Sequence, residues 1–560
     1  MKERGDTSMT ELLLEDKKGF IRYLIGCFIL LSEFLLTNYA IAKIAGVVQT
    51  GDLSDLVRYG IFGFLAFIYA GVVFIFSRLL RIGYMRDTTL RIRRRAFENI
   101  MTKTTRSFNK KLKNEYISNL VNDINTFEGK YFHALLNLIF GAEIYLASLL
   151  ILFYLEWDLA LIMVGVSFLI FLINRAFQKK TIRMQEDVQR SGERFTVNIA
   201  NTFSGLEILK LNRIEERFLL GSKRETEKLE TRKASVNIFT FWQGRFSNFL
   251  GFITTILILY YIISDLEPGY DLTRVMFVIS MASSTIWPIT EIMPLFNVLK
   301  SNATIIENIL RKEEEGDRNL EQKPYDFKKT IEVKDLTFSY GDRRIITKGN
   351  VVLEKGKKYL LKGASGAGKS TFIQLLSKVY EDYEGEILID GRDLREISED
   401  SFNQHVSFIY QDVFLFEDSI RNNICLYKTY EEKDIEKAVE GAGLLPLLEK
   451  KEKGLEEAVE ENGKNLSGGE RQRISIARAI IRNPQILFAD EVTSSLDESL
   501  GRLVEETILS LETTVIAISH RFYEGITEKY DAVIEIKNGG LHLKKMEDYL
   551  KEVQVIEEDI

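Results

Sequence analysis

The chain has 560 residues, 46% of them apolar, and a formal net charge of −7. The charge is mild and spread along the chain, so it gives no reason to expect nucleic acid as a partner. Cys27 and Cys425 are the only cysteines, which excludes a disulfide framework or a cysteine-rich metal site and fits a protein that faces the cytosol. Long apolar runs occur before about residue 310, and short ones between Gly and charged turns follow residue 331, so at least two domains are expected.

The first 19 residues are polar and mixed in charge, and we interpret them as an N-terminal cytoplasmic lead. The next run lacks a small-residue cleavage pattern, so it is expected to remain as an anchor. Six apolar runs between residues 20 and 310 are long enough, at roughly 20 residues each, to cross a bilayer as helices. Six such runs would leave a soluble fold without a polar surface, so they predict an all-α transmembrane domain. They are Phe20 to Ala45, Tyr59 to Leu80, Phe132 to Leu155, Leu159 to Phe177, Phe239 to Ile263 and Leu272 to Leu299.

The connections between these runs indicate their orientation. Two long connections, residues 81–131 and 178–238, carry clusters of Lys and Arg, whereas the other three are short and mostly acidic or neutral. Because basic residues near helix ends favour the cytoplasmic side, both termini and both long connections are predicted to be cytoplasmic, in a multi-pass protein of the plasma membrane.

The long connections contain few helix breakers, so the spanning helices are predicted to continue well beyond the lipid. Two segments interrupt the helical pattern, Asn114 to Asp123 and Thr202 to Glu216, with Gly205 as a turn position in the second. Trp287-Pro288 and Pro294 are expected to bend the sixth helix.

Two acidic residues fall near the middle of predicted spans. An ionised side chain there costs at least about 2.5 kcal/mol, so Glu33 and Glu143 each need a partner or a watery cavity. One interpretation is that they line the transport path and favour a cationic cargo. The alternative is that they pair with Lys43, Arg245 or a neighbouring helix.

A charged segment with Gly316 and Pro324, residues 311–330, is predicted to be a linker. The second domain, 331–560, then begins with alternating strands and turns. After a short apolar strand comes GASGAGKS at residues 363–370, followed by a predicted helix. Glycines in that context let backbone N–H groups close around phosphate oxygens, while Lys369 reaches the terminal phosphates and the Ser370 hydroxyl ligates Mg²⁺.

A second apolar run, residues 486–489, has the character of a buried parallel strand and ends in Asp490-Glu491. Ligands bind at the carboxyl ends of such strands. Asp490 is therefore predicted to hold Mg²⁺ through water, and Glu491 to polarise the attacking water.

The sequence LSGGE at residues 466–470, followed by Arg471, Gln472 and Arg473, resembles the signature motif of the ATP-binding cassette (ABC) transporters. The resemblance covers essentially the whole chain. It implies an exporter-type half-transporter, in which six helices with long cytoplasmic extensions precede an α/β P-loop ATPase domain.

The resemblance also implies roles for individual residues. Tyr340 would stack on adenine, Gln411 would sense Mg²⁺ and the membrane domain, and His520 would contact the γ-phosphate. Asp497 would lie at a dimer seam, and the catalytic set would be Glu491, His520, Gln411 and Lys369. The implied nucleotide contacts also include Gly363, Ala364, Ser365, Gly366, Ala367, Gly368, Ser370, Thr371, Ser467, Gly468, Gly469 and Asp490, with Ser370, Gln411 and Asp490 at the metal.

In this family the signature of one copy completes the site of another, so a dimer is implied, with a homodimer favoured over a heterodimer of related chains. The two interrupted segments resemble the family's coupling helices. The implied activity is ATP-driven export of an amphipathic drug, peptide or lipid. Two other functions are possible: import by the same architecture, and a soluble cassette ATPase acting on ribosomes or DNA, against which the six apolar runs argue. A cargo-processing peptidase is disfavoured because the N-terminal lead is short and lacks Cys and His.

Overall fold

The computed structural model describes residues 8–109, 113–264, 270–311, 325–494 and 496–558. Residue contacts divide the chain into two compact units, one formed by residues 1–102 and 111–313, the other by residues 103–110 and 314–560. Most of the predicted linker, residues 312–324, lies outside the described residues.

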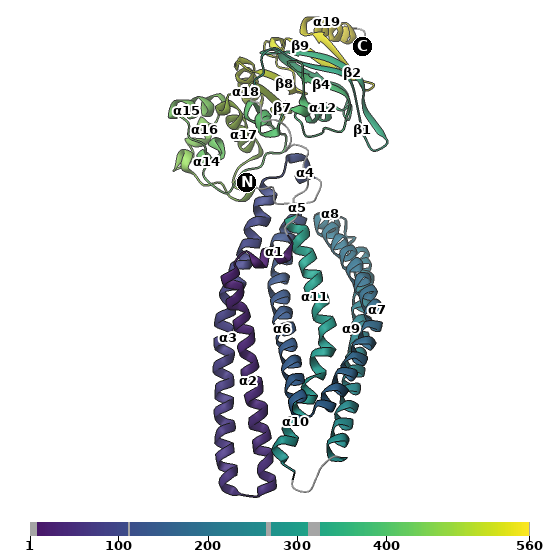
Figure 1. The fold of residues 1–560 in the computed structure, drawn as a ribbon. Coiled ribbons are helices and arrows are strands. Elements are labelled where there is room, and N and C mark those ends of the chain that lie inside the picture. Colours follow the sequence, from purple (N-terminus) through teal and green to yellow (C-terminus); the bar gives the residue numbers. More distant parts are fainter. Residues whose placement is uncertain (1–7, 110–112, 265–269, 312–324, 495, 559–560) are drawn as a thin grey trace. The chain divides into compact units, whose positions relative to one another are not determined.

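Within the described residues, all regular elements of the first unit are helices (Figure 1). Six segments are long and apolar enough to cross a membrane, as the sequence predicts. They continue far beyond the predicted apolar runs, because polar residues with few breakers extend the same helices. The elements are α1 (Met9–Leu14), α2 (Lys17–Thr50), α3 (Leu53–Met101), α5 (Lys113–Ser118), a π-helix (Asn119–Asp123), α6 (Ile124–Leu155), α7 (Trp157–Ser204), α8 (Leu206–Asn212), α9 (Glu215–Ser264), α10 (Leu272–Ser284) and α11 (Ile286–Leu310).

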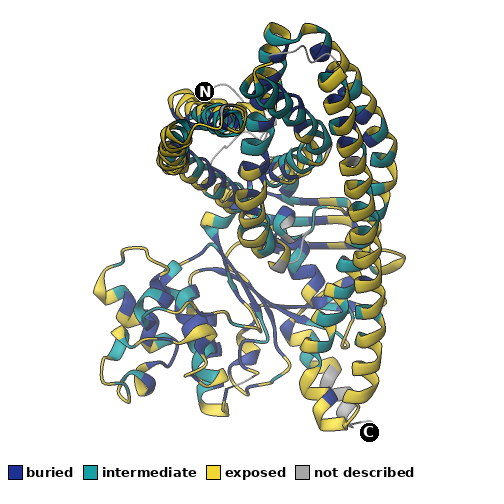
Figure 2. Ribbon diagram, turned by 90° about the horizontal axis from the view of Figure 1, so that it is seen from below, coloured by how far each residue is buried: buried dark blue, intermediate teal, exposed yellow. Residues whose placement is uncertain are grey.

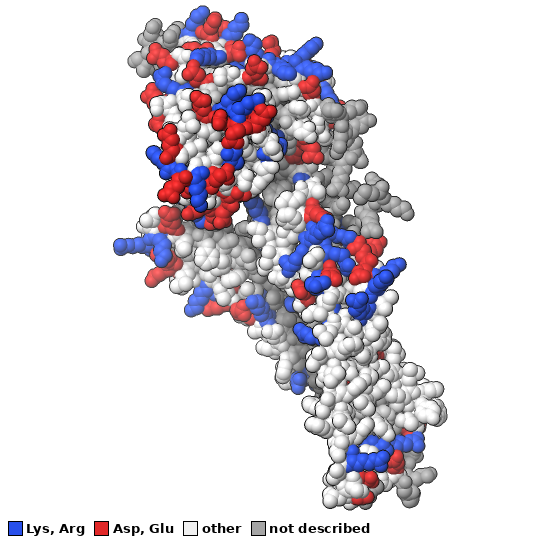
Figure 3. Space-filling view, turned by 90° about the vertical axis from the view of Figure 1, so that its left-hand side faces the viewer, with Lys and Arg blue, Asp and Glu red and all other residues white. Residues whose placement is uncertain are grey.

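Exposed residues follow the long helices (Figure 2), and many of them are large and apolar. In α3, for example, Phe67, Val72 and Ile75 are 75%, 59% and 62% exposed. On the face seen in Figure 3, this part of the unit has an uncharged band, with Lys, Arg, Asp and Glu gathered beyond both of its edges. Such a surface is suited to contact with lipid. The backbone polar groups of these helices are hydrogen-bonded within the helices, and their outward side chains are apolar.

The first interruption of the helical pattern lies earlier in the chain than predicted. Helix α3 ends at Met101 and a short helix, α4 (Thr105–Asn109), follows, whereas the predicted segment, 114–123, is helical and is interrupted only by a change from α-helix to π-helix at Asn119. Threonine side chains explain the shift, because the Thr102 hydroxyl donates to the Glu98 carbonyl and Thr104 Oγ1 accepts the Ser107 N–H at 3.2 Å. Such side chains compete with the backbone for helix hydrogen bonds.

The second interruption lies where the sequence predicts it. Helix α7 ends before Gly205, α8 follows, and Arg213 then adopts a left-handed conformation with φ 52° before α9 begins. The sixth span is broken between α10 and α11 at Thr285, close to the predicted bend. Pro288 has no N–H to donate to the carbonyl four residues earlier, which accounts for a break at this point.

The second unit contains two sheets, with strand orders β2-β1-β4-β5 and β10-β9-β3-β8-β7-β6. In the larger sheet β9, β3, β8, β7 and β6 are parallel. The strands are β1 (Thr330–Tyr340), β2 (Arg343–Glu354), β3 (Lys358–Lys362), β4 (Glu384–Ile389), β5 (Arg392–Asp393), β6 (Val406–Ile409), β7 (Ile486–Asp490), β8 (Thr514–Ile518), β9 (Ala532–Lys537) and β10 (Gly540–Lys545). The helices are α4, α12 (Lys369–Leu376), α13 (Glu399–His405), α14 (Ile420–Cys425), α15 (Glu432–Gly441), α16 (Leu445–Leu448), α17 (Gly468–Arg482), α18 (Glu498–Ser510) and α19 (Met546–Glu558).

Successive residues of the parallel strands enter different cores. Leu361 and Phe488 belong to one buried cluster, whereas Leu360 and Leu487 belong to another. A strand alternates its side chains between the two faces of a sheet, so the larger sheet is covered on both sides. The buried strands appear dark blue in Figure 2. This α/β architecture confirms the fold class predicted for the second domain.

Candidate functional site

The glycine-rich loop joins β3 to α12. Gly366 and Gly368 have φ values of +75° and +103°, in the left-handed region that favours glycine. A Cβ on Gly368 would also lie 2.6 Å from the Ile345 side chain. The Lys369 ammonium folds back over the loop, donating to the carbonyls of Gly363 at 2.9 Å and Ala364 at 3.2 Å. The loop is thus shaped as a backbone cradle closed by one positive charge.

Four loops meet at the carboxyl edge of the larger sheet. Strand pairing places Leu361 opposite Ile518, Ile518 opposite Asp490, and Ala489 opposite Ile409. The strands are parallel, so the segments that follow them emerge on the same edge. These segments carry the glycine-rich loop and three side chains singled out by the sequence, Gln411, Glu491 and His520.

The Glu491 carboxylate is the centre of this arrangement. Gln411 Nε2 donates to Glu491 Oε2 at 3.0 Å, and His520 Nε2 lies 3.3 Å from Glu491 Oε1. The backbone N–H of Glu491 donates to the Ile518 carbonyl at 3.0 Å, and its φ is 48°. The structure therefore brings three predicted catalytic residues together from separate loops.

Asp490 lies beside Ser370. Burial raises the pKa of Asp490, and a hydrogen bond with the Ser370 side chain partly offsets that effect. Together with the Gln411 amide, these residues offer oxygen donors, the ligand type that Mg²⁺ prefers. Among the described residues no group of three or more His, Cys, Asp and Glu side chains could hold a metal by itself. The donor set thus fits an ion that takes its other ligands from phosphate and water.

Tyr340 ends β1 beside α12. Its hydroxyl lies 3.4 Å from Thr371 Oγ1 and 3.4 Å from Gln374 Oε1, and the residue is 43% exposed. The ring makes T-shaped contacts with Phe338 and Tyr380. An aromatic face close to the phosphate-loop helix is thus open to a ligand.

The signature residues form the start of α17. Ser467 and Glu470 make a capping box, in which Ser467 Oγ accepts the Glu470 N–H at 3.3 Å and Glu470 Oε2 accepts the Ser467 N–H at 2.7 Å. Gly468 and Gly469 occupy the first turn. Asp497 caps α18 in the same way, and the Leu500 N–H that it accepts at 3.0 Å lowers the Asp497 pKa. These residues are held by their own helix ends.

Two residues that support the site were given no role from the sequence. Gln472 Nε2 donates to the Glu491 carbonyl at 3.5 Å. Arg521 donates to the carbonyls of Ser494 and Leu496 and so ties the loop after β7 to the loop after β8. Their position next to recognised motifs was the one available signal.

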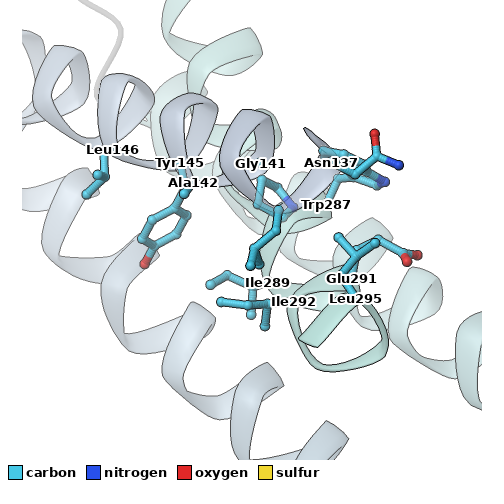
Figure 4. A pocket seen from close by; sticks show the side chains of 12 residues that line it. Asn137, Gly141, Ala142, Tyr145, Leu146, Trp287, Ile289, Glu291, Ile292 and Leu295 are labelled. Carbon is cyan, nitrogen blue, oxygen red and sulfur yellow. The ribbon is translucent and has the colours of Figure 1, made fainter. Parts of the chain in front are cut away.

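A cavity of about 230 Å³ lies between α6 and α11 in the helical unit (Figure 4). Tyr145 and Leu146 are at one end, and Asn137 and Glu291 are at the other. A Cβ on Gly141 would lie 3.5 Å from Pro288, which is an ordinary van der Waals contact, so a side chain larger than alanine would project into the space. The lining is otherwise mostly apolar, with Leu138, Ala142, Trp287, Ile289, Ile292 and Leu295 completing it.

Glu143 follows the lining residue Ala142 in α6, but it is not itself one of the residues that line the cavity. It is 6% exposed, and within the described residues neither carboxylate oxygen has a hydrogen-bond partner. The pairing considered from the sequence is not seen, because Lys43 lies over the rings of Tyr39 and Tyr59 and Arg245 over that of Phe241. Glu33 is partly buried.

Comparison with known proteins agrees with this fold and site. The family model described as the ABC transporter transmembrane region matches residues 20–289, and the one described as ABC transporter matches residues 346–494. The heterocyst differentiation ATP-binding protein HepA of a Nostoc species is 30% identical over 410 residues, which are 70% of this chain and 65% of that protein. The ATP-dependent lipid A-core flippase of Escherichia coli K12 is 27% identical over 477 residues, 80% of this chain and 78% of that one.

A solved structure of a bacterial Atm1-family ABC exporter with ATP bound has a TM-score of 0.82 at 18% identity, covering 96% of both chains. It shows the fold. An α/β phosphate-loop domain fused to six membrane-spanning helices defines a membrane transporter driven by ATP. This chain belongs to the ABC transporter family, as the transmembrane and ATPase matches in one chain show. Its relatives support export as the direction of transport.

Proposed function

We propose that this chain works as a dimer that hydrolyses Mg²⁺-bound ATP to export an amphipathic, cation-bearing cargo. The proposed ATP hydrolysis is supported most by one observation: Gln411 and His520 each lie next to a different carboxylate oxygen of Glu491. In this proposal Glu491 accepts a proton from the attacking water, and His520 donates to the terminal phosphate.

The glycine-rich loop would hold the phosphates. Its left-handed glycines, Gly366 and Gly368, turn backbone N–H groups inward, and Lys369 would exchange its present carbonyl partners for phosphate oxygens. Ser370, Asp490 and Gln411 would hold Mg²⁺, whose chemistry is to neutralise charge on the phosphates. Tyr340 would stack on the adenine.

The dimer follows from how the signature is held. Each chain has one glycine-rich loop and one signature, and Ser467 and Gly469 stand at the start of a 15-residue helix. Backbone N–H groups at a helix start suit a phosphate. We propose that Ser467, Gly468 and Gly469 complete the ATP site of a second copy, with Asp497 at the seam. A heterodimer with a related chain is the alternative.

The proposed location is the plasma membrane, with both termini and the ATPase unit cytoplasmic. The support is the charge asymmetry, because residues 91–95 include four Arg on a long connection while the short connections are mostly neutral or acidic.

The proposed cargo follows from the cavity and from Glu143. An apolar cavity of about 230 Å³ suits rings or acyl chains, and a buried carboxylate with no hydrogen-bond partner among the described residues favours a cation. The ATP-dependent lipid A-core flippase is the similar protein that supports an amphiphilic cargo. The same architecture used for import is the alternative.

Matched organic ions test this cargo class. ATP hydrolysis by the full chain in lipid vesicles is measured with tetraphenylphosphonium, a lipophilic cation, and with tetraphenylborate, an anion of similar shape. We expect stimulation by the cation alone. The combined substitution Glu33→Gln and Glu143→Gln should abolish the stimulation and leave the basal rate intact. Equal stimulation by both ions, or unchanged stimulation in the double variant, would refute the cation preference.

A further inference from the structure

Lys362 is the last residue of β3 and directly precedes the glycine-rich loop, yet its side chain forms a hydrogen bond with a different loop. Its Nζ donates to the backbone carbonyl of Ser519 at 2.7 Å. Ser519 is itself buried, at 7% exposed, and it immediately precedes His520. A charged side chain at the end of one strand therefore holds the first residue of the loop that leaves the neighbouring strand.

The other end of the same strand repeats this contact. Lys358 is the first residue of β3, and its Nζ donates to the carbonyl of Leu511 at 2.6 Å and to that of Thr513. Thr513 directly precedes β8, just as Ser519 directly follows it. Two lysines of β3 thus fix both ends of β8 through backbone carbonyls. Of these two contacts, only the one between Lys362 and Ser519, at the carboxyl edge of the sheet, lies next to the groups proposed to act on ATP.

A buried acid lies behind the Ser519 contact. Glu505 of α18 is 3% exposed, and together with Thr493, Ser519 and Tyr530 it lines a small cavity beneath the loops that follow β7 and β8. Burial lowers the Lys362 pKa, the negative charge of Glu505 raises it, and the nearby Lys369 lowers it further. Glu505 is therefore the group that favours the charged, donating form of Lys362.

We infer that Lys362 is a positioning residue for ATP hydrolysis, which holds the Ser519 carbonyl so that the His520 imidazole stays beside the Glu491 carboxylate. The inference rests on the proposed function, because it assigns Lys362 an effect only through His520. The Ser519 contact fixes the start of the loop, and His520 Nε2 lies 3.3 Å from Glu491 Oε1. A displacement of about 1 Å at a reacting group can cost about 100-fold in rate. Loss of this one hydrogen bond is therefore expected to lower turnover.

The test compares four forms of the full chain in lipid nanodiscs: parent, Lys362→Met, His520→Ala and the double variant. We expect Lys362→Met to lower kcat about tenfold or more, with KM for ATP changed less than about twofold, since the phosphate contacts are made by other residues. The double variant should be no slower than His520→Ala alone, because residues that act through one group are not additive.

Two further variants separate positioning from folding. Lys358→Met removes the matching bonds at the far end of β8, and it should lower the unfolding temperature without lowering kcat. Lys362→Arg keeps a charged donor and should retain most of the parental kcat. If Lys362→Met does not fold, the kcat of Lys362→Arg is the quantity compared with that of the parent. An unchanged kcat in Lys362→Met, or multiplied defects in the double variant, would overturn the inference. A parental rate in His520→Ala would instead refute the proposed role of His520.

Discussion

The imidazole of His520 lies 3.3 Å from a carboxylate oxygen of Glu491, although the two residues leave different strands of the sheet. Strands β7 and β8 are parallel neighbours, with Asp490 opposite Ile518, so the residues that follow them emerge side by side. Gln411 reaches the other carboxylate oxygen from the end of β6. The proposed ATPase centre therefore depends on strand register as much as on motif residues.

Glu491→Gln should abolish ATP hydrolysis while leaving ATP binding intact. The amide has nearly the same shape but cannot accept a proton, and general base catalysis contributes about 10² to 10⁴-fold in rate. Phosphate release and binding of a fluorescent ATP analogue measure the two properties separately. Loss of binding together with hydrolysis would instead assign Glu491 a structural role.

Glu505→Gln should stabilise the protein at alkaline pH. Burial raises the Glu505 pKa to about 7, partly offset by a hydrogen bond from Tyr530 and the charge of Lys362. The folded state therefore binds this proton more tightly than the unfolded state, so stability falls as pH rises from about 4.5 to about 7. The free energy of unfolding lost over this pH range is roughly 3 kcal/mol at most.

Unfolding temperatures at pH 5 and pH 8 test that sign. Glu505→Gln should unfold at a higher temperature than the parent at pH 8 and near the parental temperature at pH 5. Glu506→Gln is the matched control, because Glu506 is exposed and pairs with Lys529 at 2.6 Å. A Glu505→Gln variant that is less stable than the parent at pH 8 would contradict the assignment.

Gly141→Leu should fill the cavity between α6 and α11. The Cβ of Gly141→Ala would make ordinary contacts, 3.5 Å from Pro288 and 3.6 Å from Trp287, so alanine is the control. We expect the alanine variant to keep cargo-stimulated ATP hydrolysis and the leucine variant to lose most of it, with both basal rates unchanged. Stimulation that survives in the leucine variant would place the cargo elsewhere.

Glu399→Ala should impair transport more than ATP hydrolysis. The Glu399 carboxylate accepts the Thr105 N–H at 3.1 and 3.2 Å and the Thr105 hydroxyl at 2.5 Å, and so it anchors α4 within the second unit. Helix α4 lies between α3 and α5 in the chain, and losing a charge-assisted bond costs roughly 1.5 to 3 kcal/mol.

Transport and hydrolysis rates in the same vesicles measure this coupling. The number of cargo molecules moved per ATP should fall about fivefold or more in Glu399→Ala, given the bond that is lost. Asp400→Ala, at the exposed neighbouring position, should leave that ratio unchanged. A proportional fall of both rates would show that the contact serves only the ATPase.

The sequence predicted the features that depend on local patterns. The six apolar runs mark the spanning helices because the bilayer demands about 20 apolar residues from each. The glycine-rich loop and the Asp490-Glu491 pair were recognisable because phosphate chemistry restricts which residues can be used. Their roles in hydrolysis and metal binding stay predictions.

Other features depend on contacts between distant residues. The short helix α4 was missed because threonine side chains, not Gly or Pro, end α3. The hydrogen bond from Lys362 to Ser519 joins residues far apart in the chain. From the sequence, Lys362 is only a lysine at the end of an apolar strand. Likewise, Glu143 was predicted to need a partner or a cavity, and packing alone shows that it has no bonded partner among the described residues.

ATP-dependent movement of a lipophilic cation tests the central claim most directly. Purified chain is reconstituted into vesicles with the ATPase unit outside, and uptake of tetraphenylphosphonium is measured with ATP and Mg²⁺. We predict uptake against a concentration gradient by the parent protein and none by Glu491→Gln. Equal uptake by the two proteins, or ATP hydrolysis by the parent with no movement of any amphiphile tested, would contradict the account.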